Sequence, residues 1–254
     1  VRINSAGQVI NIKSMTSSFI PGLPMLSAGM FFLGSTSDQG QEPCITGGTI
    51  ETTHLLRDIN PGSATSVQHL GATFFKQATY FAADDGVNGI ELWKTDGTSE
   101  GTVMVKDISP GGSSSDPRYF TAVGRRLFFV ANDGQHGAEI WATDGSTEDT
   151  YLVQDTIAGL QGSDPWSLVE FKNQLLFCAK SPLNGEEIFV SDGTDAGTKV
   201  ALDLVPGAGD SNPHGLTPLK DLLLFTCDDG LHGEELWVSD GTGEKTRLVR
   251  DIWP

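Results

Sequence analysis

A repeat of 48 residues organises most of this sequence and constrains its fold more than any other feature. The segments ELWKTDGTSEGT, EIWATDGSTEDT, EIFVSDGTDAGT and ELWVSDGTGEKT place a turn aspartate at Asp96, Asp144, Asp192 and Asp240, each 48 residues after the last. An eroded copy, QEPCITGGTIETTHLLRDINPG, precedes them with Gly47 in place of the aspartate. A fixed period of this length indicates a repeat architecture, here with five copies.

Each copy resolves into four short strands, A to D, separated by turn residues. In the third copy these are residues 119–123, 127–131, 138–143 and 150–155. Strand B is apolar without alternation, as in a strand covered on both faces, whereas strands C and D alternate as expected nearer to solvent. Short antiparallel strands at this period are typical of a β-propeller blade, and a sandwich or a solenoid is the alternative. The sequence predicts an all-β, five-bladed β-propeller of four-stranded antiparallel blades in one domain, residues 1–254, with blades near 20–59, 68–108, 116–156, 164–204 and 212–252.

The first residues of the chain resemble a further strand D. VINI at residues 9–12 reads like VRDI at residues 249–252, and Asn11 precedes Pro21 by the ten residues that separate Asp155 from Pro165. Residues 1–12 are therefore predicted to be an extra strand of type D. Such a strand would flank the closing blade that contains Trp237, pair with a neighbouring molecule, or belong to a longer array.

The charge balance narrows the classes of partner. Thirty-three acidic residues against sixteen basic ones give a net charge of −17, which repels phosphate backbones and anionic lipid. No stretch approaches the ~20 apolar residues of a membrane helix. We therefore expect neither nucleic-acid binding nor membrane insertion, and a preference for cationic partners or metal ions. The three cysteines, Cys44, Cys178 and Cys227, are expected to be buried free thiols.

Two recurring motifs have structural interpretations. The Asp-Gly turns join strand C to strand D, because glycine adopts positive φ and the aspartate side chain bonds the backbone of its own turn. The aromatic residues of strand C are expected to pack between neighbouring blades, and they are Trp93, Trp141, Phe189 and Trp237.

The string ELWxTDGTxxGT followed by VxDIxPG resembles the ELWxxDGT-repeat proteins, which are secreted or surface-associated chains found mainly in bacteria. The match is strong over residues 80–254 and weak over residues 9–79. The resemblance implies a β-propeller and a secreted or extracellular location, and it implies no particular chemistry. By architecture alone the chain is also similar to the tachylectin-2 type of five-bladed sugar-binding propeller, although the motifs of that lectin are absent.

A glutamate recurs near the start of strand C, at Glu42, Glu91, Glu139, Glu187 and Glu235. It has a structural interpretation, in which it accepts hydrogen bonds from the glycine-rich loop just before it. It also has a functional one, in which it binds calcium together with acids of the preceding Asp-Gly turn. The candidate metal ligands are Asp85, Glu91, Asp133, Glu139, Asp229 and Glu235.

A second set of residues varies in identity at repeated positions. The residue before the second glycine of the loop between strands B and C is Gln39, Asn88, His136, Asn184 and His232 in successive copies, and the last four are candidate ligand-binding residues. The residue after the proline of the connector between strands D and A is Arg118, Trp166 and His214. Both segments are expected at the same end of a blade, so these side chains form a candidate recognition surface, although drift of exposed residues gives the same pattern.

No nucleophile elbow, phosphate-binding loop, metalloprotease helix or paired-cysteine zinc motif is present. The sequence favours a secreted, multivalent module that binds carbohydrate or glycoconjugates without catalysis and without an obligatory cofactor, calcium being the possible ion. A polysaccharide-active glycoside hydrolase or lyase is one alternative, because scattered carboxylates would leave no motif. A structural protein that self-associates through its terminal strand is the other.

Overall fold

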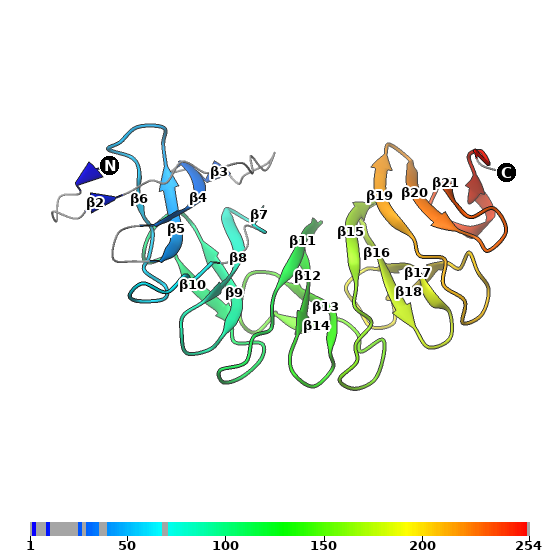
Figure 1. Ribbon diagram of the computed structural model, residues 1–254, viewed down its shortest axis with the longest axis horizontal. Helices are drawn as coiled ribbons and strands as arrows, with labels where there is room; N and C mark the ends of the chain where they lie inside the picture. The colour runs from blue at the N-terminus through cyan, green and yellow to red at the C-terminus, as the bar shows by residue number, and fades with distance from the viewer. Residues whose placement is uncertain are drawn as a thin grey trace. The chain divides into compact units, whose positions relative to one another are not determined.

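The computed structural model describes residues 2–3, 9–10, 25–26, 29–35, 40–67 and 71–252. Their backbone is all-β apart from one turn of 3₁₀ helix at Gly243–Lys245. Five sheets of four antiparallel strands follow one another along the chain (Figure 1). This repeated-sheet architecture is like that of a β-propeller, as predicted, and the closure of five blades into a ring stays a prediction.

The sheets are numbered 1 to 5 in chain order. Sheet 1 comprises β3 (Met25–Leu26), β4 (Gly29–Ser35), β5 (Gln41–Thr46) and β6 (His54–Leu55). Sheet 2 comprises β7 (Thr73–Phe75), β8 (Ala78–Asp84), β9 (Ile90–Thr95) and β10 (Val103–Lys106). Sheet 3 comprises β11 (Arg118–Val123), β12 (Arg126–Asn132), β13 (Ala138–Thr143) and β14 (Tyr151–Leu152).

Sheet 4 comprises β15 (Trp166–Phe171), β16 (Gln174–Ser181), β17 (Gly185–Ser191) and β18 (Lys199–Leu202). Sheet 5 comprises β19 (His214–Leu219), β20 (Leu222–Asp228), β21 (Glu234–Ser239) and β22 (Arg247–Leu248). The chain divides into two compact units, Val1–Arg118 with sheets 1 and 2 and Tyr119–Pro254 with sheets 3 to 5.

The terminal strand belongs to a hairpin that the sequence does not predict. Val9–Ile10 forms β2, and it pairs antiparallel with β1 (Arg2–Ile3). Further pairing with the sheet that contains Trp237 or with a neighbouring molecule stays a prediction. A hairpin between near neighbours closes a short loop, which costs less entropy than pairing with a distant segment. Residues 11 and 12 lie outside the described residues.

Burial follows the predicted gradient from strand B to strand D. Leu127 to Ala131 of β12 are all buried, whereas both residues of β14 are half-buried. The alternation predicted for strand C is wrong in sheet 3, because all of β13 is buried. Its polar residues Glu139 and Thr143 are not solvent-facing; both have hydrogen-bond partners inside the protein.

Neighbouring sheets within each unit pack through aromatic residues, as predicted. In the first unit, Phe81 and Trp93 of sheet 2 pack against Phe31 and Ile45 of sheet 1. In the second unit, the equivalent pairs are Phe177 with Phe189 and Phe225 with Trp237, and each packs against the preceding sheet. All three cysteines are buried free thiols, as predicted.

The Asp-Gly turns also have the predicted geometry. In sheet 2, Asp96 Oδ1 accepts hydrogen bonds from the backbone nitrogen and the hydroxyl of Thr98, at 2.9 and 2.7 Å. Gly97 has a φ of +96°, which glycine adopts without strain. The eroded turn of sheet 1 lacks the aspartate but keeps a threonine pair at its base, with 2.6 Å between the hydroxyls of Thr46 and Thr53.

Candidate ligand-binding face

The loops between strands B and C and the connectors between strands D and A lie at the same end of each sheet, as predicted. In the connector from sheet 3 to sheet 4, the nitrogen of Asp164 donates to Ala138 O at 3.1 Å. The carbonyl of Ser163 accepts from Lys180 N at 2.9 Å. The connector is therefore bonded to the start of strand C in one sheet and to the end of strand B in the next.

The recurring glutamate fixes the connector to its sheet. Glu139 accepts hydrogen bonds from the hydroxyl of Ser163 at 2.5 Å, from its backbone nitrogen at 2.9 Å, and from Ile157 N at 3.2 Å. The serine hydroxyl to carboxylate distance is 2.6 Å in the equivalent pairs Glu42–Ser66, Glu91–Ser115 and Glu187–Ser211. We call this arrangement the Glu–Ser clamp.

The glutamate therefore has a structural role, as the first interpretation states, but with different donors. The donors belong to the connector that follows strand D, not to the glycine-rich loop before the glutamate. The sequence shows the serine only as a residue that recurs 24 positions after the first four glutamates, at Ser66, Ser115, Ser163 and Ser211.

The clamp carboxyls are buried, and this changes their acidity. Burial raises the pKa of Glu139, and the hydrogen bond from the Ser163 hydroxyl, which lowers it, offsets only part of this effect. The same balance raises the pKa of Glu187 to about 7. Because a raised pKa favours the protonated acid in the folded state, Glu187 contributes stability that decreases as pH rises from its ordinary 4.5 through about 7.

The aspartates of the loops between strands B and C organise those loops. Asp133 Oδ1 accepts from the nitrogens of Gln135 and His136, both at 2.9 Å, and Oδ2 lies 2.7 Å from His136 Nδ1. Asp229 bonds His232 in the same way, with 2.8 Å to Nδ1. Asp85 accepts from Asn88 Nδ2 at 2.7 Å. These bonds orient the variable side chains and leave Nε2 of each histidine as the nitrogen facing away from the loop aspartate.

All six candidate metal ligands therefore have roles in the fold. Glu91 and Glu139 belong to clamps, and Glu235 accepts from Ile252 N at 2.9 Å. Asp85, Asp133 and Asp229 organise their loops. Across the described residues, no three His, Cys, Asp or Glu side chains are grouped so as to hold a metal ion. Calcium binding stays a prediction.

The hydrogen bond to Asp133 raises the pKa of His136, and the equivalent bond to Asp229 raises the pKa of His232. Burial raises the pKa of Asp133, but the bonds from Gln135 and His136 outweigh it and leave the pKa lowered. The Asp133–His136 ion pair is therefore present between the lowered pKa of the aspartate and the raised pKa of the histidine. It is lost below the first, where the aspartate is protonated, and above the second, where the histidine is neutral.

We predict that the His136 imidazole titrates with a midpoint above 6.5 and that Asp133→Asn lowers this midpoint toward 6.5. The reason is that the neutral amide oxygen of asparagine accepts a weaker hydrogen bond than the carboxylate does, and the negative charge that favours the imidazolium is also lost. An NMR titration of the ring protons measures both values, with His232 of the same sample as the control that stays raised. A wild-type midpoint at or below 6.5 would contradict the assignment.

The connectors present their variable residues from a strained backbone. Asp164 and Ser167, which flank Pro165 and Trp166, have φ of +46° and +55°. The other two connectors repeat the pattern at Asp116 with Tyr119 and at Asn212 with Gly215. Left-handed residues other than glycine cost about 1 kcal/mol or more each, and such strain concentrates at binding sites.

The variable connector side chains differ in their surroundings. Arg118 donates to Asp116 O at 3.3 Å. His214 Nδ1 lies 3.1 Å from Asn212 O, and its Nε2 lies 3.4 Å from Glu234 at the start of the next strand C. Trp166 is half-buried and packs against the cluster between sheets 4 and 5, so only part of its ring faces solvent.

The structure brings His214 beside the loop between strands B and C of sheet 5. It also shows that each of the four variable loop residues bonds an aspartate side chain. Asn184 differs from Asn88, because its Nδ2 donates to Asp203 at the end of strand D, at 3.0 Å. An exposed aliphatic residue, which the sequence pattern does not mark as functional, precedes three of the four loop residues. Val87, Leu183 and Leu231 are 73, 80 and 84% exposed.

The sequence matches no protein-family model and no curated protein. Among solved structures, the fold is similar to oligopeptidase B from Leishmania major, with a TM-score of 0.53 and 10% identity over 88% of this chain and 33% of that chain. A prolyl endopeptidase structure gives a TM-score of 0.50 and 14% identity over 87% of this chain and 33% of that one. The computationally designed Ika8 protein gives a TM-score of 0.46 and 16% identity over 87% of this chain and 57% of that one.

These likenesses concern the fold alone, and the chain spans about a third of the length of the two peptidase chains. Within the described part of the chain, no helix has the length and apolar character needed to cross a bilayer.

Proposed function

We propose that this protein is a multivalent carbohydrate-binding module without catalytic activity. The observation that supports it is a pair of adjacent residues, one aliphatic and one polar, at the tip of three loops between strands B and C. The pairs are Val87 with Asn88, Leu183 with Asn184 and Leu231 with His232. The corresponding loop of sheet 3 has Gln135, which is not aliphatic, beside His136. Sugars have an apolar face and a rim of hydroxyls, so a shallow site needs both kinds of contact.

Hydrogen bonds within the loops favour binding. Asp85, Asp133 and Asp229 hold the adjoining amide or imidazole in one orientation, so little side-chain freedom is lost when a ligand binds. Arg118 and His214 add a cation and a second imidazole at the same end of their sheets. Each site is small and exposed, so each is weak.

Repetition compensates for weak sites. Several similar sites on one chain raise the avidity for a polymeric or clustered glycan without any new contact. The resemblance to ELWxxDGT-repeat proteins supports a secreted or extracellular setting, where glycoconjugates are abundant. Calcium is a candidate ion for such binding, so the test below compares binding with and without it.

A glycan array probed with the whole chain, in calcium and in a chelator, tests the proposal. We expect binding to densely displayed glycans that decreases steeply as glycan density is lowered. An absence of binding in both conditions would contradict the proposal. Release of shortened oligosaccharides from a bound glycan would instead support the polysaccharide-active enzyme.

A further inference from the structure

The connector from sheet 3 to sheet 4 carries an exposed leucine where the neighbouring connectors have small residues. Leu160 is 76% exposed. The equivalent residues, 48 positions earlier and later, are Gly112 and Ala208. A leucine stabilises a fold when it is buried, so Leu160 contributes little to the stability of its sheet.

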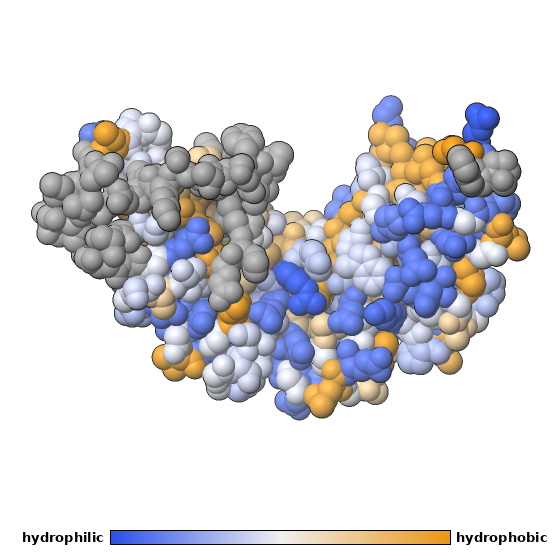
Figure 2. Space-filling view, in the orientation of Figure 1, coloured by the Kyte–Doolittle hydropathy of each residue, from blue (hydrophilic) through white to orange (hydrophobic). Residues whose placement is uncertain are grey.

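The loops between strands B and C show the opposite pattern. Sheets 2 and 4 have the exposed aliphatic residues Val87 and Leu183 at the loop tip, where sheet 3 has Gln135. Each of these sheets therefore has one exposed branched aliphatic side chain, which the loop supplies in sheets 2 and 4 and the connector supplies in sheet 3. In the lower part of the space-filling view, hydrophobic residues stand singly or in small groups among hydrophilic ones (Figure 2). Small separate apolar contacts suit several weak sites.

The connector runs alongside the loop that contains His136. Gly162 forms a parallel bridge with Ala138. Leu160 and His136 each lie two residues before a member of this bridge, and parallel segments keep equivalent residues side by side. The bridge therefore brings Leu160 toward His136.

Sheet 2 shows the same proximity at the equivalent positions. A Cβ added to Gly112 would lie 3.8 Å from the carbonyl oxygen of Val87 at the loop tip. These two residues correspond to Leu160 and Gln135 of sheet 3. An aliphatic side chain on the connector can thus take the place of one on the loop tip.

The Glu–Ser clamp holds the connector on both sides of the leucine. Glu139 accepts from Ile157 N at 3.2 Å and from Ser163 N at 2.9 Å, and these donors lie three residues before and three residues after Leu160. The loop aspartate holds His136 by its Nδ1, at 2.7 Å. Both segments are therefore fixed before a ligand arrives, which lowers the entropy cost of binding.

The pairing of a leucine with an imidazole selects a particular part of a sugar. Aromatic side chains offer a flat face on which a ring can stack. A leucine offers a small apolar area, which matches a methyl group, and the imidazole Nε2 beside it matches a hydroxyl. Terminal deoxyhexoses such as fucose and N-acetylhexosamines both have a methyl group close to hydroxyls.

We propose that Leu160 is a ligand-contact residue and that it completes, together with His136, a site for a methyl-bearing sugar at sheet 3. The site is one of the weak carbohydrate sites of the proposed function, on which it rests. It adds the residue that supplies the apolar contact of this sheet and the group that this residue accepts. Both residues belong to the second compact unit, Tyr119–Pro254.

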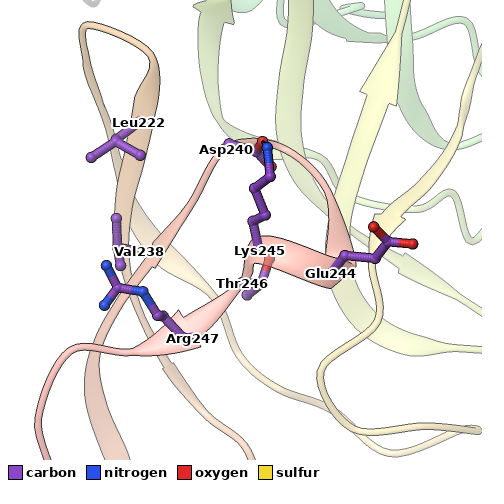
Figure 3. A pocket seen from close by; sticks show the side chains of 7 residues that line it. All are labelled: Leu222, Val238, Asp240, Glu244, Lys245, Thr246 and Arg247. Carbon is purple, nitrogen blue, oxygen red and sulfur yellow. Dashed lines mark ion pairs between the residues drawn. The ribbon is translucent and has the colours of Figure 1, made fainter.

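A pocket at sheet 5 provides a comparison, because it lies at the other end of its sheet. It is lined by the turn between strands C and D, where Asp240 pairs with Lys245 at 3.0 Å (Figure 3). This turn follows the end of β21, whereas the loop between strands B and C precedes its start. A response of Arg247, which also lines the pocket, would therefore report a sugar bound away from the loops.

An NMR titration of the whole chain tests the proposal with two pairs of sugars. D-Fucose is compared with its parent hexose D-galactose, and N-acetyl-D-glucosamine is compared with D-glucose. We expect at least one methyl-bearing sugar to shift the signals of Leu160 and His136 with a dissociation constant lower than that of its parent by about fourfold or more, the factor for one buried methyl group. The pair that shows this difference identifies the source of the methyl group.

Two variants separate the role of the leucine from that of the loop. Leu160→Ala should remove the preference for the methyl-bearing sugar at His136 and leave the other three loops unchanged. Leu160→Ala combined with Gln135→Leu should restore it, because the pair then has the arrangement of sheet 4, with a leucine on the loop and an alanine on the connector. Both positions are exposed, so the melting temperature should stay that of the wild type.

Two results would overturn the role of Leu160 and leave the proposed function intact. One is equal affinity of the wild type and Leu160→Ala at His136 while the loops still bind sugar. The other is equal affinity for each methyl-bearing sugar and its parent. No response in any loop, or a response at Arg247 alone, would overturn the proposed function together with this site.

Discussion

Glu139→Ala is expected to lower the free energy of unfolding by about 3–5 kcal/mol. The carboxylate is fully buried and accepts bonds from the Ser163 hydroxyl and from two backbone nitrogens. Alanine would leave these donors buried without an acceptor and would create a cavity. Urea denaturation followed by circular dichroism measures the change.

Ser163→Ala should cost less, about 1–3 kcal/mol, because it removes one donor and leaves the backbone bonds in place. The double variant should cost less than the sum of the two single variants, since both remove the same contact. Glu148→Ala, at an exposed turn position of the same sheet, is the control and should change stability by at most about 0.5 kcal/mol. A cost for Glu139→Ala close to that of the control would mean that the clamp does not hold the connector.

Gly137→Ala is expected to be the second most damaging change, at about 3–5 kcal/mol from left-handed strain plus overpacking. Gly137 has a φ of +69°, and an added Cβ would lie 2.4 Å from Gly162 N and 2.6 Å from Gln161 C. Both atoms belong to the connector backbone. The connector would have to move away from the loop between strands B and C, on which the candidate ligand-binding face depends.

Gly233→Ala provides a matched control at the equivalent position two repeats later. Gly233 has nearly the same φ, +70°, but its Cβ would meet nothing within 4 Å. Its substitution therefore carries the backbone strain alone, about 1–2 kcal/mol. Equal losses in the two variants, measured by denaturation under one condition, would show that the close approach of connector and loop contributes nothing.

The sequence predicts the sheets well because their signals are local. The Asp-Gly turns, the apolar run of β12 and the aromatic residue of each strand C are each sufficient to place a strand or turn, and the 48-residue period repeats them. The packing of Phe189 and Trp237 against preceding sheets follows from the same regular spacing.

The features that the sequence did not predict depend on contacts across the fold. The partner of Glu139 lies 24 residues away, and its identity as a clamp donor is visible only when strand C and the connector are placed together. Strand C has a polar residue at Glu139 that looks solvent-facing until this bond is known. Trp166 looks like an open aromatic platform, but it packs partly into the cluster between sheets 4 and 5.

The variable residues of the candidate face were identified from repetition, but their orientation was not. Their bonds to Asp133 and Asp229, and the left-handed residues around Pro165, arise from backbone geometry that composition does not encode. The exposed Leu183 and Leu231 occupy one frame of the repeat, but an apolar residue in a glycine-rich loop reads as ordinary variation until its exposure is known.

The most direct test of the proposed function is an NMR titration of the whole chain with a monovalent sugar taken from the array. The imidazole signals of His136 and His232 and the amide signals of Asn88 and Asn184 report on four separate loops. We predict that two or more of these loops respond together, with weak dissociation constants of the same order. A single tight site, no response in any of the four loops, or cleavage of the sugar would contradict it.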